Sequence, residues 1–317
     1  TNLQSFGSYN IRILNNYIYG GQYAINMGGS LVDDHDISII NNTLRQNNGM
    51  HFYNVTHLVI DHNDMRSIGQ NYYQQLGVLS CDTFVIKNNI VTNENWGDKA
   101  FDLYCNCSSS SNCQVYNNIF SSAPLWLPFA GSTLNGTNVD VINNSFGQGV
   151  EIYSSGGFRF VNNLVRSNGS FAIDMHSSTY MTAFNNNRYQ SNGAPINFLE
   201  DGNPYTFAGW KTLTGFDQQS DSVTAEYTTL TDLHLRNAVP MTGVSWPGIT
   251  TDIDGELRSL ATPTIGADEF SPNPAMNSVW PGDCDSSKTV DNFDLLPIGL
   301  YYNHFSTSRP NNPSTAW

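Results

Sequence analysis

Positive charge is scarce in this sequence of 317 residues, which has 13 Lys and Arg against 27 Asp and Glu. The formal charge of -14 argues against a nucleic-acid partner, because binding to a phosphate backbone requires basic residues. A run of about 18 apolar residues is also missing, so we expect no transmembrane segment. The chain opens inside a repeat without a leader-like segment, from which we expect a piece of a longer product.

Charged residues of either sign make up only 13% of the chain, whereas 39% of the residues are hydrophobic, which predicts a folded protein. Asparagine is unusually frequent, with 40 residues, of which 32 precede residue 200. Asn tolerates the left-handed backbone region, and its amide both donates and accepts hydrogen bonds. A repeated tight turn therefore accounts best for this composition.

An internal repeat contains the Asn residues. The pattern of two apolar residues at alternate positions, two Asn and a further apolar residue recurs eight times, in IRILNNYI (11–18), ISIINNTL (37–44), LVIDHNDM (58–65), FVIKNNIV (84–91), CQVYNNIF (113–120), VDVINNSF (139–146), FRFVNNLV (158–165) and MTAFNNNR (181–188). We place the second Asn at 16, 42, 63, 89, 118, 144, 163 and 186, with spacings of 19 to 29 residues. Alternating apolar residues on both sides of the turn are typical of strands with one buried face. In the last copy Arg188 stands where an apolar residue is expected, so we expect the regular stack to end near residue 190.

Stacking these copies predicts an all-β fold, a parallel β-helix with an Asn ladder at the turn. Residues 11–188 resemble the right-handed parallel β-helix repeats of secreted bacterial proteins, a group with pectate-lyase-like enzymes, tailspikes and adhesins. The resemblance implies right-handed coils and a secreted or cell-surface bacterial location. Segments within 207–270 are similar to the closing part of large Bacteroidetes-type exported proteins. We therefore divide the chain into coils at 1–190, a C-terminal cap at 191–275 and a tail at 276–317, and interpret Asp252, Asp254, Arg258 and Glu269 as structural ion pairs of the cap.

The tail contains a candidate calcium loop in the sequence DCDSSKTVDNFD. Its candidate ligands follow the spacing of an EF-hand-type loop: Asp283, Asp285, Ser287, Thr289 through its carbonyl, Asp291 and Asp294. The segment resembles half of a dockerin repeat, although Lys288 replaces the usual glycine and no second copy follows. We predict a Ca²⁺ ion here, and a solvated acidic turn is the alternative.

The five cysteines, Cys81, Cys105, Cys107, Cys113 and Cys284, cannot all pair within one chain. Cys113 falls in an inward column and is interpreted most simply as a buried apolar residue. A bridge from Cys105 or Cys107 to Cys113 remains open, since the intervening loop allows closure. A CxxC motif is missing, which argues against a zinc or redox site.

The third repeat carries the candidate catalytic residues Asp61, His62, Asp64 and Arg66, and Lys87 follows one coil later. Lys87 shares the outward column of Asp61, so we expect the two side chains to meet across adjacent strands. An acid, a base and cations on one face are what a polysaccharide lyase needs to remove a proton. A surface ion pair beside a turn histidine explains the same residues without a substrate, and we favour that interpretation.

Two further features point to partners. The column before the turn is outward and apolar, with Leu14, Ile40, Tyr116, Ile142, Val161 and Phe184, so we expect a loop of this chain, another subunit or a ligand to cover it. Self-assembly through this column is one of these possibilities. Loop aromatic residues offer platforms for sugars or anchors for the loops themselves, and the candidates are Tyr72, Tyr73, Trp96, Tyr104 and Trp126.

These observations favour an exported, non-enzymatic surface or matrix protein, a rigid rod for adhesion, glycan binding or assembly whose partners are glycans or other surface proteins. The alternative is a polysaccharide lyase or glycoside hydrolase with a cleft on the β-helix face. We favour the rod because the sequence shows no compact acid/base set on neighbouring coils, and because the ladder is regular. The fold alone does not decide between them.

Overall fold

The computed structural model describes residues 9–20, 23–28, 34–46, 48–67, 74–93, 99–122, 131–167, 171–176, 178–191, 196–229, 231–236 and 242–270. Residues up to Phe270 belong to one compact unit. The candidate calcium loop with Cys284 and the rest of the tail lie outside the described residues, so the calcium site stays a prediction.

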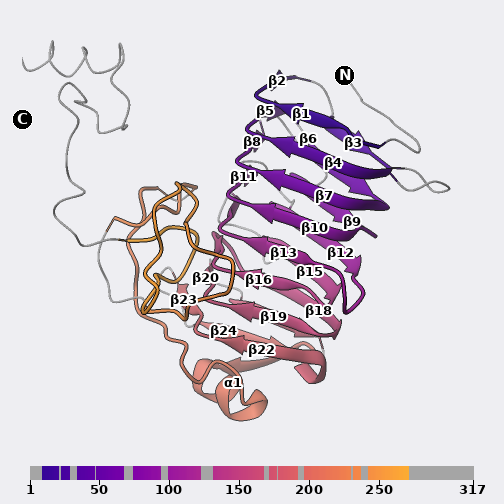
Figure 1. Ribbon diagram of the computed structural model, residues 1–317. Helices are drawn as coiled ribbons and strands as arrows, with labels where there is room; N and C mark the ends of the chain where they lie inside the picture. Colours follow the sequence, from indigo (N-terminus) through magenta and orange to yellow (C-terminus); the bar gives the residue numbers. More distant parts are fainter. Residues whose placement is uncertain are drawn as a thin grey trace, which may run out of the picture. The chain divides into compact units, whose positions relative to one another are not determined.

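The chain winds into a parallel β-solenoid with three sheets, here called A, B and C (Figure 1). Sheet A has eight strands: β1 (Arg12–Leu14), β4 (Asp34–Ile40), β7 (Val55–Asp61), β10 (Asp82–Lys87), β13 (Cys113–Tyr116), β16 (Asp140–Ile142), β19 (Phe158–Val161) and β22 (Met181–Asn185). Sheet B also has eight: β2 (Tyr17–Tyr19), β5 (Thr43–Gln46), β8 (Asp64–Ser67), β11 (Ile90–Asn93), β14 (Ile119–Ser122), β17 (Ser145–Phe146), β20 (Leu164–Ser167) and β23 (Arg188–Ser191).

Sheet C was not anticipated from the repeat, which covers only the strands of sheets A and B. It has nine strands: β3 (Tyr23–Met27), β6 (Asn48–Tyr53), β9 (Leu76–Leu79), β12 (Phe101–Asn106), β15 (Ser132–Thr137), β18 (Val150–Gly156), β21 (Ile173–His176), β24 (Asn197–Glu200) and β25 (Asn203–Thr206). A 3-10 helix, Ser178–Tyr180, follows β21. The predicted all-β parallel solenoid is confirmed.

The turn between sheets A and B forms as the repeat predicts. Its first residue has a φ between 52° and 58° in every coil, at Asn15, Asn41, His62, Asn88, Asn117, Asn143, Asn162 and Asn186. A left-handed backbone of this kind is strained for most side chains and best tolerated by Asn, apart from Gly. The turn therefore explains the repeated Asn.

The second turn residue builds the predicted amide ladder. In Asn42 the backbone N–H and the side-chain Nδ2 both donate to Oδ1 of Asn63, each at 3.0 Å. Asn63 repeats this toward Asn89 at 2.9 and 3.0 Å. Nδ2 of each amide also donates to backbone carbonyls of the turn, as Asn89 does to Ile60 and Lys87. Buried turn groups are thereby satisfied in coil after coil.

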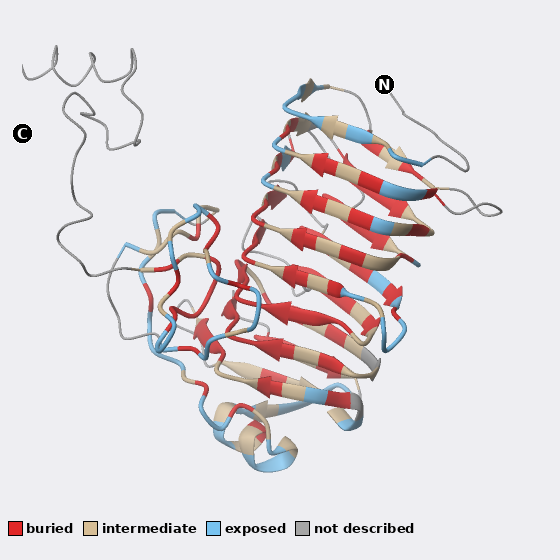
Figure 2. Ribbon diagram, in the orientation of Figure 1, coloured by how far each residue is buried: buried red, intermediate tan, exposed pale blue. Residues whose placement is uncertain are grey.

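Buried residues recur along the strands of the solenoid (Figure 2), and their apolar side chains form one core cluster between the three sheets. Phenylalanine rings of successive coils stack there, with centroids 4.5 Å apart for Phe101 and Phe120 and 5.4 Å for Phe120 and Phe146. The interior is thus packed throughout the described coils, and function must be carried by outward side chains.

The register predicted for the last copy is wrong by one residue. Asn186 takes the left-handed turn position, and Asn187, not Asn186, accepts the ladder hydrogen bond from the backbone N–H of Asn163 at 2.8 Å. An irregularity between Phe158 and Arg159 in the pairing of β19 with β22 absorbs the extra residue. Consequently Phe184 points inward instead of outward, and Tyr189 fills the inward position that we had assigned to Arg188.

Residues from the predicted cap close the C-terminal end of the solenoid. Strand β25 folds back antiparallel to β24, and α1 (Phe207–Thr214) follows with the fully buried Trp210. The ladder ends on Asp217, whose carboxylate accepts hydrogen bonds from Asn187, Tyr189, Trp210 and Ser220. Burial raises the pKa of Asp217 to about 6 despite these four donors. Among the described residues, no helix has the length and apolar character that crossing a membrane requires.

The described residues 221–229, 231–236 and 242–270, here called the flank segment, lie along the outside of sheets A and B (Figure 1). Ile249 packs on Ile142 and Val161 of the apolar outward column, so a segment of the same chain covers this part of it. At the first coil Leu14 stays 41% exposed. The flank segment also covers a second outward column in sheet B, through the contact of Leu233 with Ile119.

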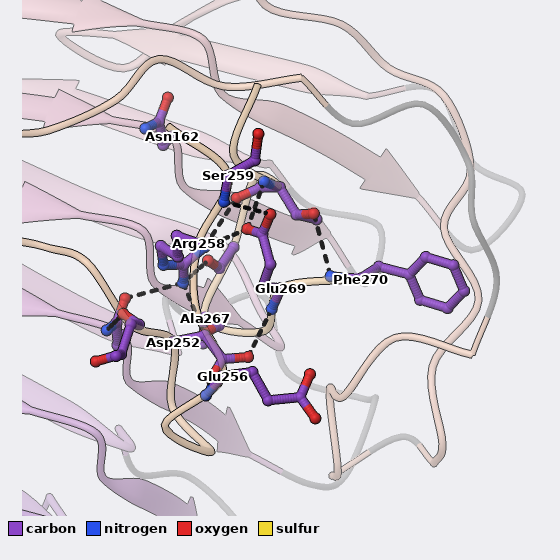
Figure 3. Close-up of polar contacts among 12 residues, drawn as sticks. Asn162, Asp252, Glu256, Arg258, Ser259, Ala267, Glu269 and Phe270 are labelled. Atoms are coloured by element: carbon purple, nitrogen blue, oxygen red, sulfur yellow. Dashed lines mark hydrogen bonds and ion pairs between the residues drawn. The ribbon is translucent and has the colours of Figure 1, made fainter. Parts of the chain in front are cut away.

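A buried ion pair holds the flank segment together (Figure 3). Nη1 of Arg258 lies 3.3 Å from Oε2 of Glu269, and Nη2 donates to Oδ1 of Asn117 on the solenoid at 2.9 Å. The interpretation of Arg258 and Glu269 as a structural pair is confirmed. Asp252 instead accepts backbone N–H groups, including that of Glu269 at 2.8 Å, and so shapes the loop.

Cys107 and Cys113 form a disulfide, one of the pairings left open by the sequence. Cys81 and Cys105 are free and buried. Burial raises the pKa of Cys81 to about 12 and that of Cys105 further, so neither thiol is ionised near neutral pH. Both act as apolar core residues.

Candidate functional site

The sequence-predicted site forms only in part. Lys87 lies opposite Asp61 in the register of β7 and β10, with Nζ 3.4 Å from Oδ2 of Asp61, as expected. His62 places Nδ1 2.6 Å from Oδ1 of the same carboxylate, and Asn88 donates to that oxygen at 3.0 Å. Three neighbours therefore occupy the Asp61 carboxylate.

Asp64 and Arg66 lie beyond the turn, on strand β8 of sheet B. Nη2 of Arg45 is 2.5 Å from Oδ2 of Asp64, and Nε of Arg66 is 3.2 Å from Oδ1. The five predicted residues thus separate into two groups of ion pairs, one on each side of the turn. Each carboxylate is already paired with a cation, which supports the interpretation as structural ion pairs.

A different polar set lies on the outer face of sheet C. Strand register aligns two outward rows there. The first row is His51, Gly77, Asp102, Thr133, Glu151, Asp174 and Leu199, and the second is Tyr53, Leu79, Tyr104, Asn135, Tyr153 and His176. A row of carboxylates therefore lies beside a row rich in aromatic side chains.

Glu151 is at the centre of this set. Its carboxylate accepts hydrogen bonds from the Tyr153 hydroxyl at 2.8 Å and the Thr133 hydroxyl at 3.0 Å. Nε2 of His176 lies 3.4 Å from Oε1, and Nζ of Lys99 lies 3.8 Å from Oε2. The Glu151 side chain remains 23% exposed, so a ligand in solvent can reach it.

Asp174 stands beside Glu151 on the next strand, β21, with a side chain 16% exposed. Its Oδ1 is 3.6 Å from Nε2 of His176, and neither atom has a hydrogen-bond partner among the described residues. The His176 ring stacks on Tyr153 with centroids 4.0 Å apart. Carboxylate oxygens of Glu151 and Asp174 and a ring nitrogen of His176 all lie within 4.8 Å of one another.

The surroundings shift the two carboxyl groups in opposite directions. Burial favours the neutral form of both. For Glu151, hydrogen bonds from Tyr153 and Thr133 and the nearby cations outweigh burial and lower the pKa. For Asp174, burial dominates and the charge of Glu151 adds to it, so the pKa is raised. Burial likewise raises the pKa of Asp102.

Three clusters among the described residues have ligand spacing for a metal: Asp82 with Cys107 and Cys113, Asp252 with Asp254 and Asp268, and Glu151 with Asp174 and His176. The first cluster cannot supply three metal ligands, because Cys107 and Cys113 form a disulfide with each other. The second is tied into the flank segment by backbone hydrogen bonds, such as the one from the N–H of Leu235 to Asp268. The third is the cluster in which none of the three groups is buried.

Reasoning from the sequence missed the sheet C set. The sequence alone did not bring Glu151 and Asp174 together, whereas the structure places them opposite each other on adjacent strands. A signal was present: the order apolar, acid, apolar, Tyr or His occurs in FDLY (101–104), VEIY (150–153) and IDMH (173–176). Of the predicted aromatic platforms, Tyr104 lies in the second row and is 48% exposed, whereas Tyr72, Tyr73, Trp96 and Trp126 lie outside the described residues.

Comparison with models of known families, with curated proteins and with solved structures gave no significant match for this chain. The site must therefore be interpreted from its own geometry.

Proposed function

We propose that this protein hydrolyses glycosidic bonds of a glycan that lies along the outer face of sheet C. The observation that supports this is the pair Glu151 and Asp174, two carboxyl groups on adjacent strands with carboxylate oxygens within 4.8 Å. Glycoside hydrolysis requires one carboxylic acid and one carboxylate beside the same bond. Paired groups whose environments push their pKa values apart meet that requirement.

The assignment of roles follows from the pKa directions. Asp174 keeps its proton to higher pH than an ordinary Asp and serves as the general acid, whereas Glu151 stays ionised and serves as the nucleophile. Tyr153 has its pKa raised to about 12, first by burial, so its hydroxyl stays protonated and keeps donating to Glu151. Each group thus holds the protonation state that its role needs.

The reaction proceeds in two balanced steps. First, Asp174 gives its proton to the glycosidic oxygen while a Glu151 oxygen bonds to the anomeric carbon and the glycosidic bond breaks. Second, a water oxygen attacks that carbon, Asp174 takes a proton from the water, and the ester bond to Glu151 breaks. Retaining enzymes place their carboxyl groups about 5 Å apart, so the short separation here predicts retention of configuration.

The charge of the face favours hydrolysis over the lyase alternative. Asp102, Glu151 and Asp174 lie in one row, with Lys99 as the nearby cation and the His176 ring beside them. Removal of a proton beside a uronate carboxylate requires cations to neutralise that carboxylate, and a polyanion is repelled by this row. The substrate is therefore a neutral glycan, whose rings stack against Tyr104 and Tyr153 in the second row.

The test is an assay for released reducing ends on a panel of neutral polysaccharides. We expect activity on at least one of them, and Glu151→Gln should reduce the rate by roughly a hundredfold or more. Asp61→Asn removes a carboxylate from the other cluster and serves as the matched control, with a rate like that of the original protein. The proposal is contradicted if no polysaccharide of the panel releases reducing ends, or if Glu151→Gln has the same rate as the Asp61→Asn control.

A non-enzymatic role in adhesion or assembly at the cell surface is the second candidate. Tyr17 and Tyr19 on the first coil favour it, because they are 67% and 71% exposed and their rings stack at 6.5 Å. Exposed stacked aromatic rings suit contact with a glycan or protein partner. Export fits both candidates, since disulfides such as Cys107–Cys113 persist in oxidising compartments. Calcium in the tail would add a further attachment segment.

A further inference from the structure

The carboxyl pair on sheet C includes a histidine that the hydrolytic reaction leaves without a role. Nε2 of His176 lies 3.4 Å from Oε1 of Glu151 and 3.6 Å from Oδ1 of Asp174. The three residues are only partly buried, but Nε2 and the Asp174 oxygen are themselves shielded from solvent and have no hydrogen-bond partner among the described residues. Shielded polar atoms normally have a partner, so this arrangement suits a ligand that contacts both atoms.

The separations fit the coordination sphere of a small cation. A tetrahedral Zn²⁺ ion binds nitrogen and oxygen at about 2.0 to 2.2 Å, which places two of its ligand atoms about 3.3 to 3.6 Å apart. The two distances from Nε2 of His176, 3.4 and 3.6 Å, lie in this range. Carboxylate oxygens of Glu151 and Asp174 lie within 4.8 Å of each other and of the ring nitrogen, so one ion can contact all three groups.

Neighbouring side chains hold these groups in place. The Tyr153 hydroxyl donates to Oε1 of Glu151 at 2.8 Å, and the Thr133 hydroxyl donates to Oε2 at 3.0 Å. The His176 ring stacks on Tyr153, with centroids 4.0 Å apart and planes 7° apart. Outer contacts of this kind orient the ligands of metal ions in proteins. The three side chains are therefore positioned in advance for an ion.

Charge and ligand type select the ion. The negative charges of Glu151, Glu200 and Asp201 all act on Asp174, and the nearby cation is Lys99, 3.8 Å from Glu151. A divalent cation offsets this surplus of negative charge. Ca²⁺ and Mg²⁺ prefer oxygen ligands, whereas an imidazole nitrogen suits Zn²⁺. The mixed set of two carboxylates and one imidazole therefore favours zinc.

We propose that Glu151, Asp174 and His176 bind a Zn²⁺ ion, which leaves the fourth coordination position to water. Zinc-bound Asp174 has no proton to give, and zinc-bound Glu151 is not free to attack a sugar. Zinc and hydrolysis therefore exclude each other, and the ion acts as an inhibitor. This inhibition rests on the proposed function, whereas zinc binding itself does not.

Isothermal titration of the full chain with zinc chloride, after removal of metals by a chelator, tests the site. His176→Gln should weaken zinc binding at least about tenfold, because it removes the nitrogen ligand. His57→Gln removes a 59% exposed histidine from sheet A and is the matched control, with zinc binding like that of the original protein. Equal zinc affinity in the two variants overturns the proposal.

A second variant guards against a folding defect at His176. Asp174→Asn keeps the shape of the side chain and removes one anionic ligand, so it should also weaken zinc binding at least about tenfold. Thermal unfolding midpoints without zinc show whether each variant is folded. Unaltered zinc affinity in folded Asp174→Asn overturns the proposal, and so does calcium chloride that binds these residues as tightly as zinc chloride.

The reducing-end assay separates the zinc site from the proposed hydrolysis. Saturating zinc should slow the release of reducing ends at least about tenfold, and a chelator should restore the rate. Hydrolysis that continues at the same rate with zinc bound overturns the inhibition. Zinc binding that depends on His176, in a protein that hydrolyses no polysaccharide of the panel, supports the zinc site and contradicts the proposed function.

Discussion

Two polar clusters on this solenoid have similar composition and opposite organisation. At the turn between sheets A and B, Asp61 is bound by Lys87, His62 and Asn88, and Lys87 supplies a charge of the opposite sign. On sheet C, two carboxyl groups, Glu151 and Asp174, lie side by side on adjacent strands, and the pKa of Glu151 is lowered whereas that of Asp174 is raised. The first arrangement is that of structural ion pairs, whereas neighbouring groups whose pKa values are shifted in opposite directions are typical of catalytic sites.

The largest expected difference between the clusters is in the dependence of activity on pH. Burial raises the pKa of Asp174, so its acid form persists to higher pH than in an ordinary Asp. Activity should be highest at mildly acidic pH and fall about tenfold per pH unit above that pKa. Initial rates across a pH series measure this limb. Asp61→Asn should give the same pH–rate profile as the original protein. A changed profile in that variant would show that the general acid belongs to the Asp61 cluster and not to sheet C.

Tyr153→Phe sharpens the comparison within sheet C. The variant keeps the ring that stacks on His176 and loses the hydroxyl that donates to Glu151 at 2.8 Å. Without this donor the pKa of Glu151 rises, so the acidic limb of the rate profile should move to higher pH and the rate should fall about tenfold. Tyr104→Phe, in the same row, is the control. An acidic limb that stays in place would show that the Tyr153 hydroxyl does not act on Glu151.

Substitutions in the two clusters should change the free energy of unfolding in opposite directions. Asp61→Asn loses an ion pair and should lower the free energy of unfolding by about 1 kcal/mol. Above the raised pKa of Asp174, where this group is ionised, Asp174→Asn removes a like charge beside Glu151 and should raise the free energy of unfolding by about 0.5 kcal/mol, as substitutions at active sites often do. Urea unfolding midpoints compare the two. Destabilisation by Asp174→Asn equal to that by Asp61→Asn would mean that both clusters are structural.

The smallest effect is expected from Lys87→Met. Its Nζ is 3.4 Å from Asp61 with a side chain 31% exposed, so the loss should be at most about 0.5 kcal/mol and should shrink in high salt. Unfolding midpoints at low and high salt measure it. Lys99→Met, which removes the cation 3.8 Å from Glu151, should alter the rate profile instead. Loss of activity in Lys87→Met would contradict the assignment of Lys87 to a structural ion pair.

Sheets A and B were predictable because one turn of fixed length joins them. Apolar residues keep the same offset from the ladder in every coil, as Ile60 and Met65 do around Asn63. The last copy failed because three consecutive Asn, residues 185 to 187, allow two registers, and only the pairing of β19 with β22 selects one.

Sheet C and its site could not be aligned in this way, because connections of variable length precede its strands. Glu151 lies 7 residues after the ladder residue Asn144, whereas Thr133, on the adjacent strand in the same row, lies 15 after Asn118. Residues that share a row therefore have no common spacing in the sequence. The covering of Ile142 by Ile249 was equally hidden, since the contact joins residues more than 100 positions apart.

The Asn ladder has a direction. From Asn16 to Asn144 each ladder side-chain amide donates to the ladder Asn of the next coil, Asn163 does so through its backbone N–H, and the last donor, Asn187, donates to the carboxylate of Asp217. Bond dipoles in such a row add head to tail, so a negative group belongs at the end toward which the hydrogens point. Because each rung repeats the one before it, whole coils can be gained or lost by duplication or deletion while this terminal group still closes the row. The length of the molecule is therefore free to evolve separately from the chemistry on its surface.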